Sequence, residues 1–115
     1  MRTAILKSTM EWKMLYDGRL RATVRCVDAR RANGLRKALG GRVQGPSLHL
    51  EGDELLRAAA AVGGPPGALY ALQQYRAVLP GKGRRLEEPD RCRKILRAQE
   101  FLRSMAEAGW AVHGL

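Results

Sequence analysis

The stretch Arg19–Cys26, with the sequence RLRATVRC, decides the fold expected for this chain. Apolar residues alternate there with arginines and one threonine, and successive side chains of a strand point to opposite faces. The apolar set is Leu20, Ala22, Val24 and Cys26, and the polar set is Arg19, Arg21, Thr23 and Arg25. The alternation therefore predicts a strand with one buried face and one cationic face.

The residues before this stretch predict a partner strand. Asp17-Gly18 separates the stretch from another extended run, Thr3–Tyr16, and Asp-Gly between two such runs is a strong hairpin signal. We expect one long strand over Thr3–Tyr16, bulged near Ser8–Met10, and leave open a short helix over Met10–Tyr16. The chain is thus expected to open with a β-ribbon whose solvent-facing side is basic.

Helices and a second, smaller hairpin are expected to follow. Asp28 can cap a helix over Ala29–Leu39, and Gly40-Gly41 suits its left-handed end. The later elements are strands over Arg42–Gln44 and Ser47–Glu51 across a Gly45-Pro46 turn, then helices from Asp53 to Val62, over Ala68–Leu79 and from Pro89 to Ala108, with Trp110 folding back onto the body. This order predicts an α+β fold, in which helices cover one face of an antiparallel sheet made of two hairpins. No repeat or linker divides residues 1–115, so we expect a single domain.

The chain is strongly basic. Its 115 residues include 21 Lys and Arg against 11 Asp and Glu, which gives a formal net charge of +10. A GC-rich genome accounts for much of the preference for Arg over Lys, but it accounts less well for the excess of base over acid. Such a charge predicts attraction to polyanions, nucleic acid first and anionic membrane second.

The candidate nucleic-acid-binding residues lie on the polar side of the arginine-rich strand, in the helix after it, in the second hairpin and in a basic loop. They are Arg19, Arg21, Thr23, Arg25, Arg30, Arg31, Arg42, His49, Lys82, Arg84 and Arg85. Arginine pairs bidentately with phosphates and with guanine edges, while a solvated strand face is the alternative. The aromatic residues are scattered, which argues against a stacking platform for single strands and favours contacts with a duplex. We therefore favour DNA over RNA.

We expect no catalytic residue, metal site or cofactor. The two cysteines show no CxxC or metal-ligand spacing, and the two histidines, His49 and His113, are isolated. Helix capping accounts for Asp28, Asp53, Glu87 and Asp90. No apolar run approaches the roughly 20 residues that span a bilayer, and no signal peptide precedes the first strand. We expect no membrane contact and an intracellular location, in cytoplasm or nucleoid, with an organelle left open.

Three segments resemble the core of LAGLIDADG homing endonucleases. They are the arginine-rich strand leading into the helix that closes as Leu35–Val43, the strand and helix of Ser47–Leu56, and the helix Ala68–Leu79 followed by a Pro-Gly loop and a long helix from Pro89. The resemblance covers residues 3–106 and rests on the order and spacing of elements. It implies the scaffold of that family and its nucleic-acid surface.

The resemblance does not extend to the namesake helix, which precedes the first hairpin in that family and ends in the acidic residue that holds the catalytic metal. Asp17-Gly18 could stand for the end of that helix only if Met10–Tyr16 were helical. We therefore expect binding without cleavage, and leave open a metal-dependent, magnesium-using DNA endonuclease, active or completed by a second chain. A basic subunit of a ribonucleoprotein, an inhibitor of an acidic protein, and a homodimer are also left open.

Overall fold

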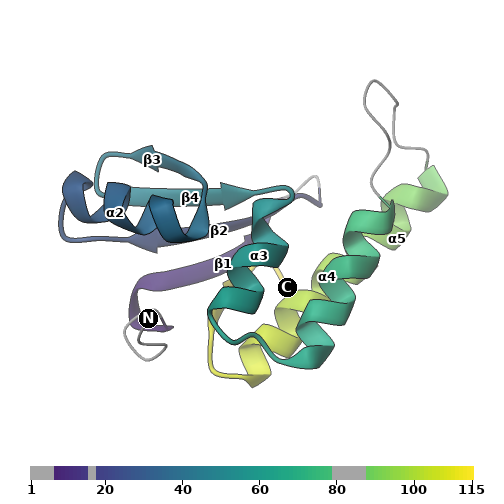
Figure 1. Ribbon diagram of the computed structural model, residues 1–115. Coiled ribbons are helices and arrows are strands. Elements are labelled where there is room, and N and C mark those ends of the chain that lie inside the picture. Colours follow the sequence, from purple (N-terminus) through teal and green to yellow (C-terminus); the bar gives the residue numbers. More distant parts are fainter. Residues whose placement is uncertain (1–6, 16–17, 79–87) are drawn as a thin grey trace.

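Strand β2 (Leu20–Arg25) lies in the middle of a five-stranded sheet with the order β3-β4-β2-β1-β5 (Figure 1). It pairs antiparallel with β1 (Met10–Met14) on one side and with β4 (Ser47–Glu51) on the other. Beyond β4 lies β3 (Arg42–Gln44), and beyond β1 lies β5 (Ala111–His113). The structure, a computed structural model, describes residues 7–15, 18–78 and 88–115.

The alternation in the sequence sets the two faces of this sheet. Trp12 lies opposite Ala22, and Ala22 lies opposite Leu50, so one row of apolar side chains crosses three strands. The buried strand residues on this face are Met10, Trp12, Leu20, Ala22, Val24, Leu48 and Leu50. Residues of the other parity are polar and half-buried or exposed in β2 and β4. The predicted division into an apolar and a polar face is confirmed.

Helices α2 (Ala29–Leu39), α3 (Glu54–Ala61), α4 (Pro66–Val78) and α5 (Glu88–Glu107) follow in the predicted order. Their buried residues join the apolar face of the sheet in one core, and α4 and α5 run alongside each other at one end of it (Figure 1). The α+β class is confirmed. Asp28 caps α2, because its Oδ1 accepts a hydrogen bond from the backbone N–H of Arg31 at 2.8 Å.

The sheet is mixed rather than wholly antiparallel, which corrects the prediction. The chain turns at Gly109, and Ala111–His113 then pairs parallel with Glu11–Lys13. Trp110 is buried against Trp12, with ring centroids 5.9 Å apart, so the chain is drawn back to the edge of β1 as expected for that tryptophan. Three residues are too few to show a period of two, so the sequence could not indicate β5.

The first strand is shorter than the predicted Thr3–Tyr16. Residues 7–9 are helical, and the strand covers only Met10–Met14, where the alternation of apolar and charged residues begins. Ser8 and Thr9 are residues whose side chains compete with the sheet for backbone hydrogen bonds, which favours a turn there. The alternative of a helix over residues 10–16 is wrong for the strand residues, and the ends of the predicted strand, residues 3–6 and 16, lie outside the described residues.

Candidate nucleic-acid interface

The polar face of the sheet, called here the open face, is built in three rows that cross the strands. In the middle row Arg42, His49, Thr23 and Glu11 follow one another from β3 to β1. The second row contains Glu51, Arg21, Lys13 and His113, and the third contains Gln44, Ser47 and Arg25. Arg42 and Glu11 are 31 positions apart in the sequence, yet both lie in the middle row, on β3 and β1. Arg21 lies in the neighbouring row on β2, the strand beside β1.

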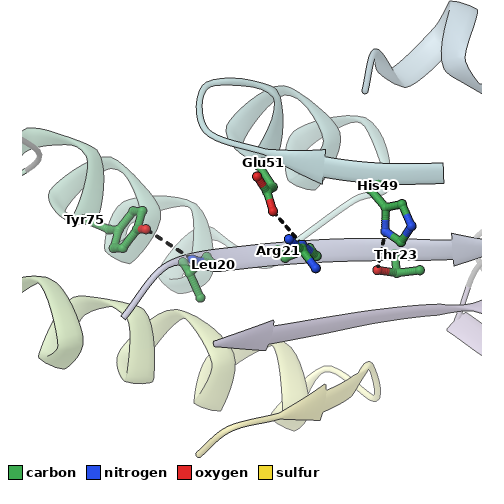
Figure 2. A network of polar contacts seen from close by, with 6 residues as sticks. All are labelled: Leu20, Arg21, Thr23, His49, Glu51 and Tyr75. Atoms are coloured by element: carbon green, nitrogen blue, oxygen red, sulfur yellow. Dashed lines mark hydrogen bonds and ion pairs between the residues drawn. The ribbon is translucent and has the colours of Figure 1, made fainter. Parts of the chain in front are cut away.

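The acids of the open face are held by basic partners on neighbouring strands. Arg21 Nε donates to Glu51 Oε1 at 2.5 Å, with both side chains partly exposed (Figure 2). Glu11 Oε2 lies 3.2 Å from His113 Nε2. Arg25 and Arg42 are exposed and Lys13 is half-buried, so these cations add to a face whose two carboxylates are already engaged. The open face is therefore net positive.

His49 lies at the centre of this face. Its Nδ1 is 3.2 Å from Thr23 Oγ1 on the adjacent strand (Figure 2). Partial burial lowers the pKa of His49, and the positive charges of Arg21, Arg42 and Lys13 lower it further, against a smaller opposing effect of Glu51. The imidazole is thus neutral near pH 7, and it can exchange a hydrogen bond with the threonine hydroxyl.

Two hollows border the open face. One of about 220 Å³ lies beside Arg42, His49 and Glu54, at the start of α3. The other, of about 310 Å³, lies between Lys7–Thr9 and the side chains of Thr23 and Arg25. Each hollow has an exposed arginine at its edge together with carboxylates, Glu51 and Glu54 in the first and Glu11 in the second.

Tyr75 of α4 contacts the first residue of β2. Tyr75 is buried, and its hydroxyl oxygen accepts a hydrogen bond from the backbone N–H of Leu20 at 3.2 Å (Figure 2). This contact anchors the first residue of β2 to the helical layer. It therefore sets the position of Arg21, the next residue, on the opposite side of the sheet.

The structure brings together only some of the predicted binding residues. Arg21, Thr23, Arg25, Arg42 and His49 share the open face, and Arg19 is exposed just before β2. Arg30 and Arg31 are exposed in the first turn of α2, a helix that packs on the apolar face. The loop residues Lys82, Arg84 and Arg85 lie outside the described residues. Sequence reasoning missed Lys13 and Glu51, which lie on either side of Arg21. A two-residue turn at Asp17-Gly18 would place Lys13 opposite Ala22, whereas the register places it opposite Arg21.

Comparisons with protein-family models, with curated proteins and with solved structures find no match. Within residues 7–15, 18–78 and 88–115, no group of three or more His, Cys, Asp or Glu side chains could hold a metal ion. No helix in the described part of the chain is long and apolar enough to cross a membrane.

We expect His49→Gln to reduce the acid sensitivity of the fold. The pKa of His49 is lower in the folded protein than its ordinary value of 6.5, so the unfolded chain binds a proton at higher pH than the folded one. Stability therefore falls as the pH decreases through 6.5 toward the folded pKa. The free energy of unfolding, measured with urea, should decrease more between about pH 7.5 and about pH 5.5 for the wild type than for the variant. Equal losses would contradict this prediction.

Proposed function

We propose that the protein binds nucleic acid through the open face, with duplex DNA as the favoured form, and does not cleave it. The observation that carries this proposal is the charge of that face. Its two acids are held in pairs, while Arg25 and Arg42 are exposed and Lys13 adds a third charge. Cations arranged over a surface in this way suit the phosphates of a nucleic acid, since each neutralised phosphate releases a counterion.

The composition of the open face favours a duplex over a single strand. The buried aromatic residues Trp12, Tyr75, Phe101 and Trp110 belong to the core, and the exposed Tyr70 stands on α4. The described part of the open face thus offers no Phe, Tyr or Trp ring on which an unpaired base could stack. Arg42 on β3 and Lys13 on β1 are three strand spacings and one row apart, roughly 16 Å, which is of the same order as the width of a major groove, about 12 Å. Cations at this separation can reach the phosphates on both sides of a groove.

The LAGLIDADG-like scaffold is part of the same proposal. The order of elements from β1 to α5 is the order that the resemblance implies, whereas β5 is an addition to it. The proposal of binding without cleavage is supported by the pairing of Glu11 with His113 and of Glu51 with Arg21, because carboxylates engaged in this way are not directed at a shared metal ion.

The salt dependence of binding tests the proposal. Fluorescence anisotropy with a labelled DNA duplex should give an affinity that falls steeply with salt. In the double variant Arg25→Gln, Arg42→Gln, two phosphate contacts are lost, so the slope of log K against log salt should become less steep by about 2, and the affinity at about 50 mM salt should fall by roughly two decades. Adding Mg²⁺ should leave the duplex uncut.

The matched control is Arg57→Gln, Arg103→Gln, which removes the same charge from exposed positions of α3 and α5. Its salt slope should equal that of the wild type. The same shift in both double variants would mean that net charge, not the open face, drives binding. Absence of binding to duplex DNA would overturn the proposal, and cut DNA would overturn its non-cleaving part.

A further inference from the structure

A second, chemically different surface lies beside the end of β2. It is a groove of about 520 Å³ between α2 and the residues that follow the strand. Val24, Cys26 and Val27 form one wall and Leu35 lies in the other. Val27 is 85% exposed, and Leu35 is only half-buried. Val27 and Leu35 thus leave apolar surface open to water, which is unfavourable unless something covers it.

Two rows of side chains on α2 face different surroundings, one the core and the other the groove. Ala32 and Leu39 pack into the core, whereas Arg31 and Leu35, one turn apart, line the groove. Gly34 also lines it, and a Cβ added at Gly34 would meet no atom within 4 Å. A side chain introduced at position 34 would therefore enter unoccupied space.

The charges at the groove are predominantly positive. Arg25 and Arg31 both line it and both are exposed. Asp28 lies nearby, but its carboxylate caps α2 by accepting a hydrogen bond from the Arg31 N–H at 2.8 Å. The two guanidinium groups therefore stand at the edge of an apolar groove, where each can form a two-pronged pair with a carboxylate.

We propose that this groove binds a small amphipathic carboxylate, the size of a medium-chain fatty acid. Its hydrocarbon body lies against Val24, Val27 and Leu35, and its carboxylate pairs with Arg25 or Arg31. A volume of about 520 Å³ falls in the range typical of small-molecule sites, which are mainly apolar with a few polar groups that fix orientation. The proposal does not rest on nucleic-acid binding, and either one can fail without the other.

The two cysteines provide the test. Cys26 is half-buried in the wall of the groove, and burial together with the charge of Asp28 raises the pKa of its thiol. Cys92 is exposed on α5 and serves as an internal reference. Alkylation by N-ethylmaleimide, resolved for each cysteine by mass spectrometry, should slow at Cys26 when decanoate is added. The rate should fall by the factor 1 + [L]/Kd, about tenfold at nine times Kd, while the rate at Cys92 stays unchanged.

Variants separate the two parts of the site. Gly34→Leu fills the groove with a good helix former, and the protection of Cys26 by decanoate should disappear. Arg25→Gln, Arg31→Gln should weaken protection, whereas Arg57→Gln on α3 should not. Decanol should protect less than decanoate. The proposal is overturned if decanoate gives no protection, if it slows both thiols equally, if Gly34→Leu retains the protection, or if decanol protects as well as decanoate.

Discussion

Trp12→Ala should lower the free energy of unfolding by about 3–5 kcal/mol, the usual cost of truncating a large buried aromatic residue. Trp12 is 1% exposed, and its ring meets Phe101 edge-on with centroids 5.5 Å apart and Trp110 with centroids 5.9 Å apart. It thus joins β1 to α5 and to the residue that leads into β5. Urea unfolding followed by circular dichroism measures the change.

The indole N–H of Trp12 makes a second variant informative. Its Nε1 is buried and has no hydrogen-bond partner among the described residues. Trp12→Phe keeps a ring between Phe101 and Trp110 and removes this unsatisfied donor. It should therefore lower the free energy of unfolding clearly less than Trp12→Ala does. Tyr70→Ala, at a position 63% exposed, should change stability by less than about 0.5 kcal/mol. Equal losses for the phenylalanine and alanine variants would show that ring packing is not what Trp12 contributes.

The faces of the sheet could be predicted because they depend on a local signal. Arg21, Thr23 and Arg25 alternate with apolar neighbours, and a period of two assigns them to one face whatever the strand pairs with. The positions of β5 and of Trp110 depend on tertiary packing at the edge of β1. The sequence indicated that Trp110 returns to the core, but it could not indicate the parallel pairing of the three residues that follow.

The candidate sites were less accessible to sequence reasoning, because they depend on contacts between distant residues. Arg21 and Glu51 are 30 positions apart, and only the β2–β4 register makes them a pair. Gly34 lines the apolar groove, but in the sequence it indicates only an irregularity within a helix. Patterns of residue type indicate which side chains face solvent, whereas pairing and vacant space require the positions of neighbouring elements.

Gly41→Ala is the second substitution from which we expect a large effect. Gly41 has a φ of +96°, and an added Cβ would lie 2.6 Å from the His49 carbonyl oxygen and 2.7 Å from Leu50 Cδ2. The backbone strain and the overlap together should cost about 2–6 kcal/mol. Gly45→Ala is the matched control, since Gly45 also has a positive φ, +59°, but an added Cβ meets nothing within 4 Å. It should show only the backbone cost, about 1–2 kcal/mol.

The comparison of these two variants also bears on the open face. Gly41 directly precedes Arg42, whose side chain stands beside His49 because β3 approaches β4 closely at this point. Relief of the overlap in Gly41→Ala requires β3 to shift, which would move Arg42 within the middle row. At temperatures where both variants are folded, Gly41→Ala should therefore bind duplex DNA more weakly than Gly45→Ala. Equal affinities would mean that the position of Arg42 does not matter for binding, and that this arginine acts only through its charge.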